Sequence, residues 1–109
     1  MIVYGISTCA LTKRAIKTLE DAGREVAFRD VRADPMSDDE WAALLLEFGD
    51  RLVDRKSSDW RGLNEWLKNS DADAQLAAKP KLMTRPVIQD GDAFHLGWDD
   101  AVQAALIET

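Results

Sequence analysis

The fold is decided by residues 2–19, which read Ile-Val-Tyr-Gly-Ile-Ser-Thr-Cys-Ala-Leu-Thr-Lys-Arg-Ala-Ile-Lys-Thr-Leu. The stretch begins as a β-prone apolar run, turns at residues 5–8 and continues with apolar residues at helical spacing. Cys9, the only cysteine, stands where the strand gives way to the helix. There its sulfur faces unpaired backbone N–H groups and the positive end of the helix dipole, and Lys13 and Arg14 add positive charge. The stretch therefore predicts a reactive thiol.

Length and composition indicate one small globular domain spanning residues 1–109. Hydrophobic residues make up 46% of the chain and charged residues 31%, which is ordinary for a globular protein. No apolar run approaches the roughly 20 residues of a membrane span, and the first residues lack the basic region of a secretory signal. The lack of such a run leads us to expect no membrane association. A single cysteine allows no internal disulfide, so we expect the protein to lie in a reducing cytoplasm.

Charge and histidine content argue against two classes of site. The net charge of −6 argues against a nucleic-acid partner, which normally requires a basic patch. Ten of the fourteen basic residues nevertheless fall within residues 13–17, 51–61 and 79–85. These three stretches form a local positive site if the fold brings them together, and otherwise they are solvated ends of helices. His95 is the only histidine, and with one cysteine it cannot form a tetrahedral metal site, so we expect a structural role for it and no metal.

The first third of the chain has the pattern of a βαβ unit. We expect a strand over Met1–Ile6, a helix over Ala10–Ala22 and a second strand over Glu25–Val31. Gly23 is suited to end the helix, because glycine accepts a left-handed conformation. A helical crossover makes the two strands parallel.

The middle of the chain is expected to be a helical insertion at about residues 37–80. Ser37 and Glu40 form a capping box at its start. The expected helices run from this capping box to Gly49, from Ser58 or Asp59 to Leu67, and from Ser70 or Asp71 to Leu76, before Pro80. Their tryptophans are expected to lie mostly in the core.

The last third is expected to form a hairpin and a closing helix. Leu82–Ile88 and Ala93–Leu96 are extended patterns joined by a turn at Gly91, and Asp99–Ile107 has helical spacing. The whole order is then βαβ, helices, ββα. This is the connectivity of an α/β thioredoxin-like domain with a four-stranded mixed sheet.

Thr12 and the Arg85-Pro86 dipeptide bear on the chemistry of such a domain. Thr12 stands where a dithiol enzyme of this topology carries its second cysteine. Its hydroxyl can hydrogen-bond a thiolate at Cys9 but cannot resolve a mixed disulfide, so a redox cycle needs an external thiol such as glutathione. Thioredoxin-like domains place a cis proline opposite the thiol, and Arg85-Pro86 is the candidate, although the sequence leaves cis and trans open.

Four motifs, in order and suitably spaced, extend over nearly the whole chain. They are Tyr4-Gly5-Ile6-x-x-Cys9 followed by Lys13-Arg14-Ala15, Leu52-Val53-Asp54-Arg55, Trp60-Arg61-x-Leu63, and Leu82-Met83-x-Arg85-Pro86-Val87-Ile88. Together they resemble the ArsC/Spx family, and its YffB-like branch most closely. The resemblance implies a thioredoxin-like fold with a helical insertion and one reactive cysteine after the first strand.

The resemblance also implies roles for particular residues. In the family's arsenate reductases the thiolate attacks arsenate, and glutathione and glutaredoxin complete the reduction. By resemblance, Cys9 is the nucleophile, Arg55 binds the oxyanion and Arg85 is the arginine before the proline. Gly97 replaces a further arginine of those enzymes, and Lys13 replaces another. Spx-type and YffB-like members also lack the later arginine, so the resemblance to them is closer than to the arsenate reductases.

We therefore expect a monomeric, single-cysteine thiol oxidoreductase of arsenate reductase-like type, without a bound cofactor. Glutathione is the expected co-substrate and glutaredoxin a further expected partner. Cys9 is the expected nucleophile; the residues expected to bind substrate or an anion are Thr12, Lys13, Arg55, Arg85 and Pro86. Two alternatives remain open: a non-catalytic, Spx-like adaptor that docks on a macromolecule, and a glutathione-binding protein without turnover.

Overall fold

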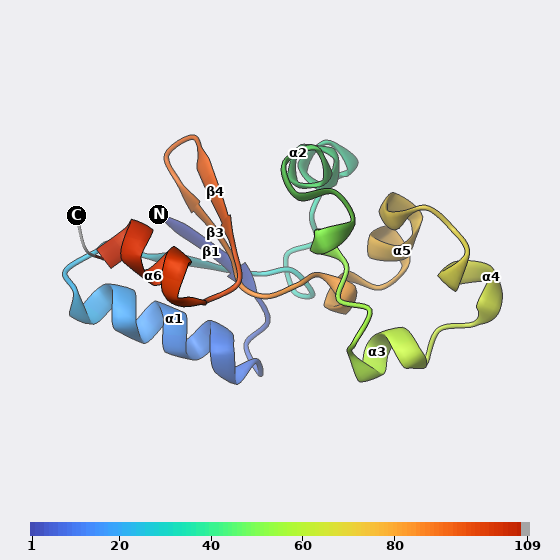
Figure 1. Cartoon of the computed structure of the whole chain (residues 1–109), viewed down its shortest axis with the longest axis horizontal. Coiled ribbons are helices and arrows are strands. Elements are labelled where there is room, and N and C mark those ends of the chain that lie inside the picture. Colours follow the sequence, from blue (N-terminus) through green and yellow to red (C-terminus); the bar gives the residue numbers. More distant parts are fainter. Residues whose placement is uncertain (108–109) are drawn as a thin grey trace. The chain divides into compact units, whose positions relative to one another are not determined.

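The elements follow the expected order of βαβ, helices, ββα, in a computed structural model that describes residues 1–107 (Figure 1). The strands are β1 (Ile2–Gly5), β2 (Ala27–Asp30), β3 (Val87–Asp90) and β4 (Ala93–Leu96). The helices are α1 (Ala10–Asp21), α2 (Asp38–Phe48), α3 (Ser58–Arg61), α4 (Glu65–Lys68), α5 (Ala72–Ala78) and α6 (Asp100–Ile107), with 3₁₀ helices η1 (Gly49–Leu52) and η2 (Pro80–Leu82). The chain forms two compact units, which we call the sheet unit (Met1–Asp30 and Arg85 onward) and the helical unit (Val31–Thr84).

The sheet unit contains a four-stranded mixed sheet in the order β2-β1-β3-β4. β1 pairs with β2 in parallel, while β1 with β3 and β3 with β4 are antiparallel. In this register Tyr4 lies between Arg29 of β2 and Val87 of β3. The parallel pair follows from the helical crossover and the antiparallel pair β3–β4 from the short turn at Gly91, whose φ is 62°. The expected mixed sheet is confirmed.

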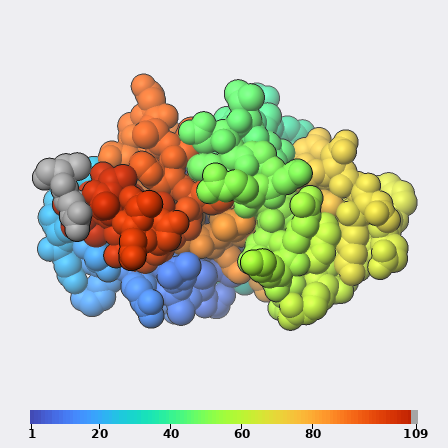
Figure 2. Space-filling model, in the orientation of Figure 1, coloured from blue at the N-terminus to red at the C-terminus, as the bar shows by residue number. Residues whose placement is uncertain are grey.

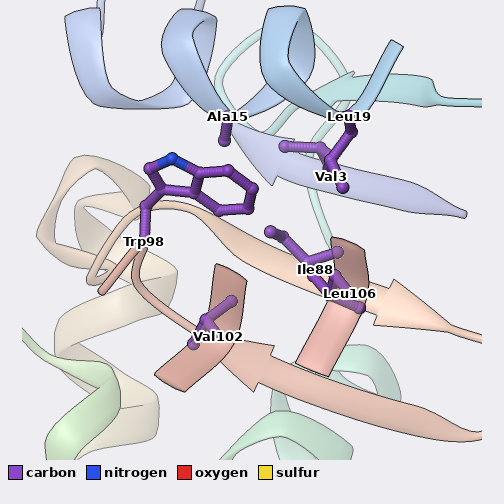
Figure 3. Packing of buried hydrophobic residues seen from close by; sticks show 7 residues of the cluster. All are labelled: Val3, Ala15, Leu19, Ile88, Trp98, Val102 and Leu106. Atoms are coloured by element: carbon purple, nitrogen blue, oxygen red, sulfur yellow. The ribbon is translucent and has the colours of Figure 1, made fainter. Parts of the chain in front are cut away.

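The core of the sheet unit lies between the sheet and the helices α1 and α6 (Figure 3). Buried side chains from all these elements and from the loop before α6 form one cluster: Val3, Ala15, Leu19, Ile88, Trp98, Val102 and Leu106. The red C-terminal helix accordingly lies beside blue N-terminal residues on the face seen in Figure 2. The Arg24 guanidinium connects α6 with β3, because it donates to the Leu106 carbonyl at 2.7 Å and to the Asp90 carboxylate at 3.1 Å.

Helix α1 ends as the sequence predicts but turns one apolar residue outward. Gly23 has a φ of 85° and follows the last turn, where the Arg24 N–H donates to the Leu19 carbonyl at 3.0 Å. Leu11 shares the apolar spacing of this helix with Ala15 and Leu19, but it is 38% exposed, whereas the other two are completely buried. Leu11 belongs to the first turn of the helix.

The helical unit begins with the expected capping box. The Ser37 hydroxyl accepts a hydrogen bond from the Glu40 N–H at 3.2 Å, and the Glu40 carboxylate accepts one from the Ser37 N–H at 2.9 Å. Helix α2 packs against α5, and residues 53 and 83 form an isolated antiparallel bridge. The buried apolar residues of this unit include Trp41, Leu44, Leu52, Leu76, Leu82 and Met83.

Several expected boundaries in the middle of the chain are wrong. The single helix expected up to Leu67 is two short helices, α3 and α4, because Gly62 ends the first and the Asn64 side chain caps the second, accepting from the Leu67 N–H at 2.8 Å. Trp66 is consequently 77% exposed rather than in the core. The strand expected from Leu82 begins only at Val87.

None of the helices within residues 1–107 has the length and apolar character needed to cross a membrane.

Candidate functional site

Cys9 occupies the N-cap position of α1, on a loop held at both sides. The Cys9 N–H donates to the Ile6 carbonyl at 3.0 Å, and the Ser7 N–H donates to the Asp30 carboxylate at the end of β2 at 2.9 Å. The first helical bond runs from the Lys13 N–H to the Cys9 carbonyl at 3.1 Å. The backbone N–H groups of residues 10–12 therefore have no helical acceptor, and a sulfur at the N-cap position faces them.

Thr12 is completely buried, and its position depends on Gly5. A Cβ on residue 5 would lie 2.5 Å from Thr12 Oγ1 and 2.6 Å from Cγ2, so only glycine fits opposite this threonine. Thr12 Oγ1 has no hydrogen-bond partner of standard geometry among residues 1–107. The Cys9 thiolate is a strong acceptor and interacts with this hydroxyl. The buried hydroxyl thus stabilises the ionised sulfur and lowers the pKa of Cys9.

The environment of Cys9 lowers the pKa of its thiol. Partial burial raises the pKa, but it is outweighed by the Thr12 hydroxyl and the Thr12 backbone N–H, the positive charge of Arg85 and the Leu11 N–H. Each of these groups stabilises the thiolate and not the neutral thiol. The net result is a pKa below the ordinary value of a cysteine.

Arg85 and Pro86 reach this region through the pairing of β1 with β3. Tyr4 lies opposite Val87, so continuing the register by one residue puts Gly5 opposite Pro86. The Arg85-Pro86 peptide bond is cis, and the Pro86 carbonyl accepts from the Gly97 N–H at 2.8 Å. The half-buried Arg85 makes no hydrogen bond or ion pair within residues 1–107, so its five N–H donors remain available to an anionic ligand.

Two further residues expected at the site lie differently. Lys13 is exposed on α1 and is not among the groups that shift the Cys9 pKa. Arg55 belongs to the helical unit, where its guanidinium lies 5.4 Å from the centre of the Trp60 ring and 3.9 Å from the Asp50 carboxylate. The structure therefore associates Cys9 with Thr12 and Arg85, while the assignment of Arg55 to the same site stays a prediction.

The contribution of Gly5 was not foreseen from the sequence, which indicated only a turn residue there. Periodicity places Thr12 on the helix and Gly5 at the end of a strand, but it does not show that their side-chain positions meet.

In the part of the chain described, 1–107, no group of three or more histidine, cysteine, aspartate or glutamate side chains is arranged to hold a metal ion.

Comparison with known proteins agrees with this architecture. The model of the ArsC family matches residues 4–106. The chain belongs to the ArsC family. The expected resemblance is thereby confirmed, and the thioredoxin-like fold of this family agrees with the connectivity described above.

Individual relatives of this ArsC-family chain cover almost its whole length. A protein of Haemophilus influenzae described as uncharacterized is 40% identical over 98 residues, which are 84% of this chain and 86% of that protein. The solved structure of the YFFB protein superposes with a TM-score of 0.88 at 26% identity and covers 97% of both chains. An arsenate reductase (ArsC) related protein from Brucella melitensis has a TM-score of 0.75 at 26% identity and covers 99% of this chain and 94% of its own.

Proposed function

We propose that this ArsC-family chain is a single-cysteine thiol oxidoreductase that uses glutathione as its reductant. The observation that carries the proposal is the lowered pKa of Cys9, produced by the Thr12 hydroxyl, the first amides of α1 and Arg85. A thiol with a lowered pKa is ionised to a greater extent than an ordinary cysteine at a given pH, and it is also a better leaving group. Membership of a family with arsenate reductase-like relatives supports the same type of chemistry.

The proposed reaction is a pair of thiol–disulfide exchanges. The Cys9 thiolate attacks one sulfur of a substrate disulfide R–S–S–R′, forms Cys9–S–S–R and releases R′–S⁻, which takes a proton from solvent. A glutathione thiolate then attacks the Cys9 sulfur and releases R–S⁻, which takes a proton from solvent. A second glutathione attacks the resulting Cys9–glutathione disulfide, which gives oxidised glutathione and restores the Cys9 thiolate. Two glutathione molecules are thus oxidised for each substrate disulfide reduced.

Two features of the chain favour an external reductant and an anionic ligand. Thr12 occupies the position of a resolving cysteine and cannot displace a bound thiol, so the second sulfur comes from solution. Arg85, which has no partner among residues 1–107, offers a forked donor for a carboxylate of glutathione or of the substrate. Gly97 stands where arsenate reductases of this family carry a further arginine, which favours disulfides over arsenate as substrates.

A glutathione-coupled assay tests the proposal. The wild-type chain is incubated with bis(2-hydroxyethyl) disulfide, glutathione, glutathione reductase and NADPH, and in a parallel arm with arsenate, glutathione and glutaredoxin. We expect turnover of the disulfide, and mass spectrometry should detect one glutathione attached to Cys9. Lys17→Met, which removes an exposed charge from the same helix, is the matched control and should retain both properties.

The result of Cys9→Ser decides between the proposal and its alternatives. This variant should lose both the glutathione adduct and turnover. Turnover that survives in Cys9→Ser would rule out the assigned nucleophile. A wild-type chain that forms the adduct without turnover would instead be a glutathione-binding protein, and one that does neither but retains a bound partner protein would be an adaptor.

A further inference from the structure

Helix α2 is more apolar than the packing of the helical unit requires. Seven of the eight residues from Trp41 to Phe48 are apolar, although only Trp41 and Leu44 are buried. Leu46 is 89% exposed, and Leu45 is half-buried. A helix that covers a core on one side normally has a polar opposite side. The second apolar side of α2 is therefore unexplained by the core, and such surfaces commonly mark sites of interaction.

This second apolar side forms one wall of a groove. α2 and α5 lie next to one another (Figure 1), and the groove between them has a volume of about 750 Å³. On the α2 side its apolar lining is Trp41, Ala42, Leu45 and Leu46. On the α5 side Ala74 and Ala77 present only methyl groups, which leaves the groove open to an inserted side chain. All of these residues belong to the helical unit.

The rim of the groove is acidic. Asp38 and Asp39 in the first turn of α2 and Asp73 in the first turn of α5 line it, and none of the three forms an ion pair within residues 1–107. The chain has no lysine or arginine between residues 33 and 50, or between residues 69 and 78. Neither wall therefore carries a lysine or arginine side chain that could pair with these carboxylates. Such a field attracts cationic groups and repels anionic ones.

We propose that the groove between α2 and α5 binds a short basic amphipathic helix of a partner protein. Apolar side chains of the partner would pack against Leu45 and Leu46, and its lysine or arginine side chains would reach the three rim aspartates. At 1.5 Å per residue, the seven residues of α5 limit the groove to about 10 Å, or two turns of a bound helix. An interface of this size is small, so the complex should be transient.

The inference is tested by NMR titration of the ¹⁵N-labelled full chain with designed peptides. The probe is a 12-residue helical peptide with leucines at i, i+3, i+4 and i+7 and lysines elsewhere. One control peptide replaces every lysine by glutamate, and another keeps the composition but scrambles the leucine spacing. We expect only the first peptide to bind, with shifts concentrated in α2 and α5 and an affinity that weakens as salt is added.

Variants of the protein locate the binding. Leu46→Lys, which places a charge on an exposed position and so leaves the fold intact, should weaken binding of the lysine peptide by about tenfold or more. Trp66→Lys alters an equally exposed apolar residue outside the groove and should have no effect. The double variant Asp38→Asn with Asp73→Asn should bind more weakly and with a smaller dependence on salt.

Several results would overturn the inference. Equal binding of the glutamate or scrambled peptide would show that neither the charge nor the apolar stripe is recognised. Shifts outside α2 and α5, or an unchanged affinity in Leu46→Lys, would place the binding elsewhere. Self-association of the free chain that disappears in Leu46→Lys would make the groove a contact between two copies of this chain. If the lysine peptide does not bind at all, the proposed binding of a basic helix is rejected.

Discussion

Replacing Thr12 by valine should stabilise the protein while making its thiol less reactive. Valine has nearly the shape of threonine, so it fits the same completely buried space beside Gly5. It lacks the hydroxyl, which has no hydrogen-bond partner of standard geometry among residues 1–107 but stabilises the Cys9 thiolate. The two consequences of losing one oxygen atom therefore have opposite signs.

The size of the stability change follows from the burial of the hydroxyl. A buried polar group without a hydrogen bond costs about 1–3 kcal/mol, and a methyl group in its place adds favourable burial. We expect the free energy of unfolding to rise by about 1–2 kcal/mol at a pH where Cys9 is neutral. The pKa of Cys9 should rise at the same time, because the largest group lowering it is removed.

Urea denaturation at a pH well below the midpoint of Cys9 alkylation, together with the pH dependence of that alkylation, measures the two effects in Thr12→Val. Thr12→Ser is the matched control, because it keeps the hydroxyl and loses only a methyl group; it should be less stable than wild type and keep the low pKa. A Thr12→Val variant destabilised by more than about 1 kcal/mol would show that the hydroxyl has a partner when Cys9 is neutral. A Cys9 pKa that does not move would show that the hydroxyl does not stabilise the thiolate.

Three other changes give separate tests. Because the fold lowers the pKa of Cys9, the ionised thiol should stabilise wild type relative to Cys9→Ser. The difference between their free energies of unfolding should increase as the pH rises from below the folded pKa of Cys9 towards the roughly 8.5 of a free thiol, and it should be lost as the pH falls through the folded pKa. Identical pH profiles of the two proteins in urea denaturation would contradict this expectation. Gly5→Ala should lower the free energy of unfolding by about 1–3 kcal/mol because its Cβ meets Thr12, and in a double-mutant cycle most of this loss should disappear in a Thr12→Ala background, whereas simple additivity would argue against the contact. Gln75→Glu should cost at least about 2 kcal/mol in thermal or urea unfolding, because the buried Gln75 Nε2 donates to three backbone carbonyls that a carboxylate would repel; Gln103→Glu, with one such bond on a half-buried side chain, should cost less.

The parts of the fold set by local rules could be predicted from the sequence. Gly23 ends α1, and Ser37 with Glu40 begins α2, because in each case a particular residue type satisfies backbone geometry or backbone hydrogen bonds. The order of strands and helices then restricts the sheet to the mixed arrangement observed. Periodicity was less informative for Trp66, since it shows which residues share a helix face but not whether another element covers that face.

The candidate site was predictable in part. The place of Cys9 at a strand-to-helix junction was enough to predict a thiol with a lowered pKa, and the pairing of β1 with β3 brings Arg85 into its field as the resemblance implied. The burial of Thr12 against Gly5 could not be predicted, because it depends on how closely two elements approach: a Cβ on residue 5 would lie only 2.5 Å from Thr12 Oγ1. The apolar outer side of α2 was also not predicted, because helical spacing places Leu45 on the same apolar face as Trp41 and Leu44 and does not show which apolar residues stay uncovered.

The pH dependence of Cys9 alkylation by iodoacetamide measures directly whether the fold favours the thiolate form of Cys9. Cys9 is the only cysteine, so the rate reports one sulfur without ambiguity. We expect a midpoint clearly below the roughly 8.5 of a free thiol, with a shift upward in Arg85→Met and none in Lys17→Met. A wild-type midpoint at or above that of a free thiol would show that Thr12, the first amides of α1 and Arg85 do not stabilise the thiolate.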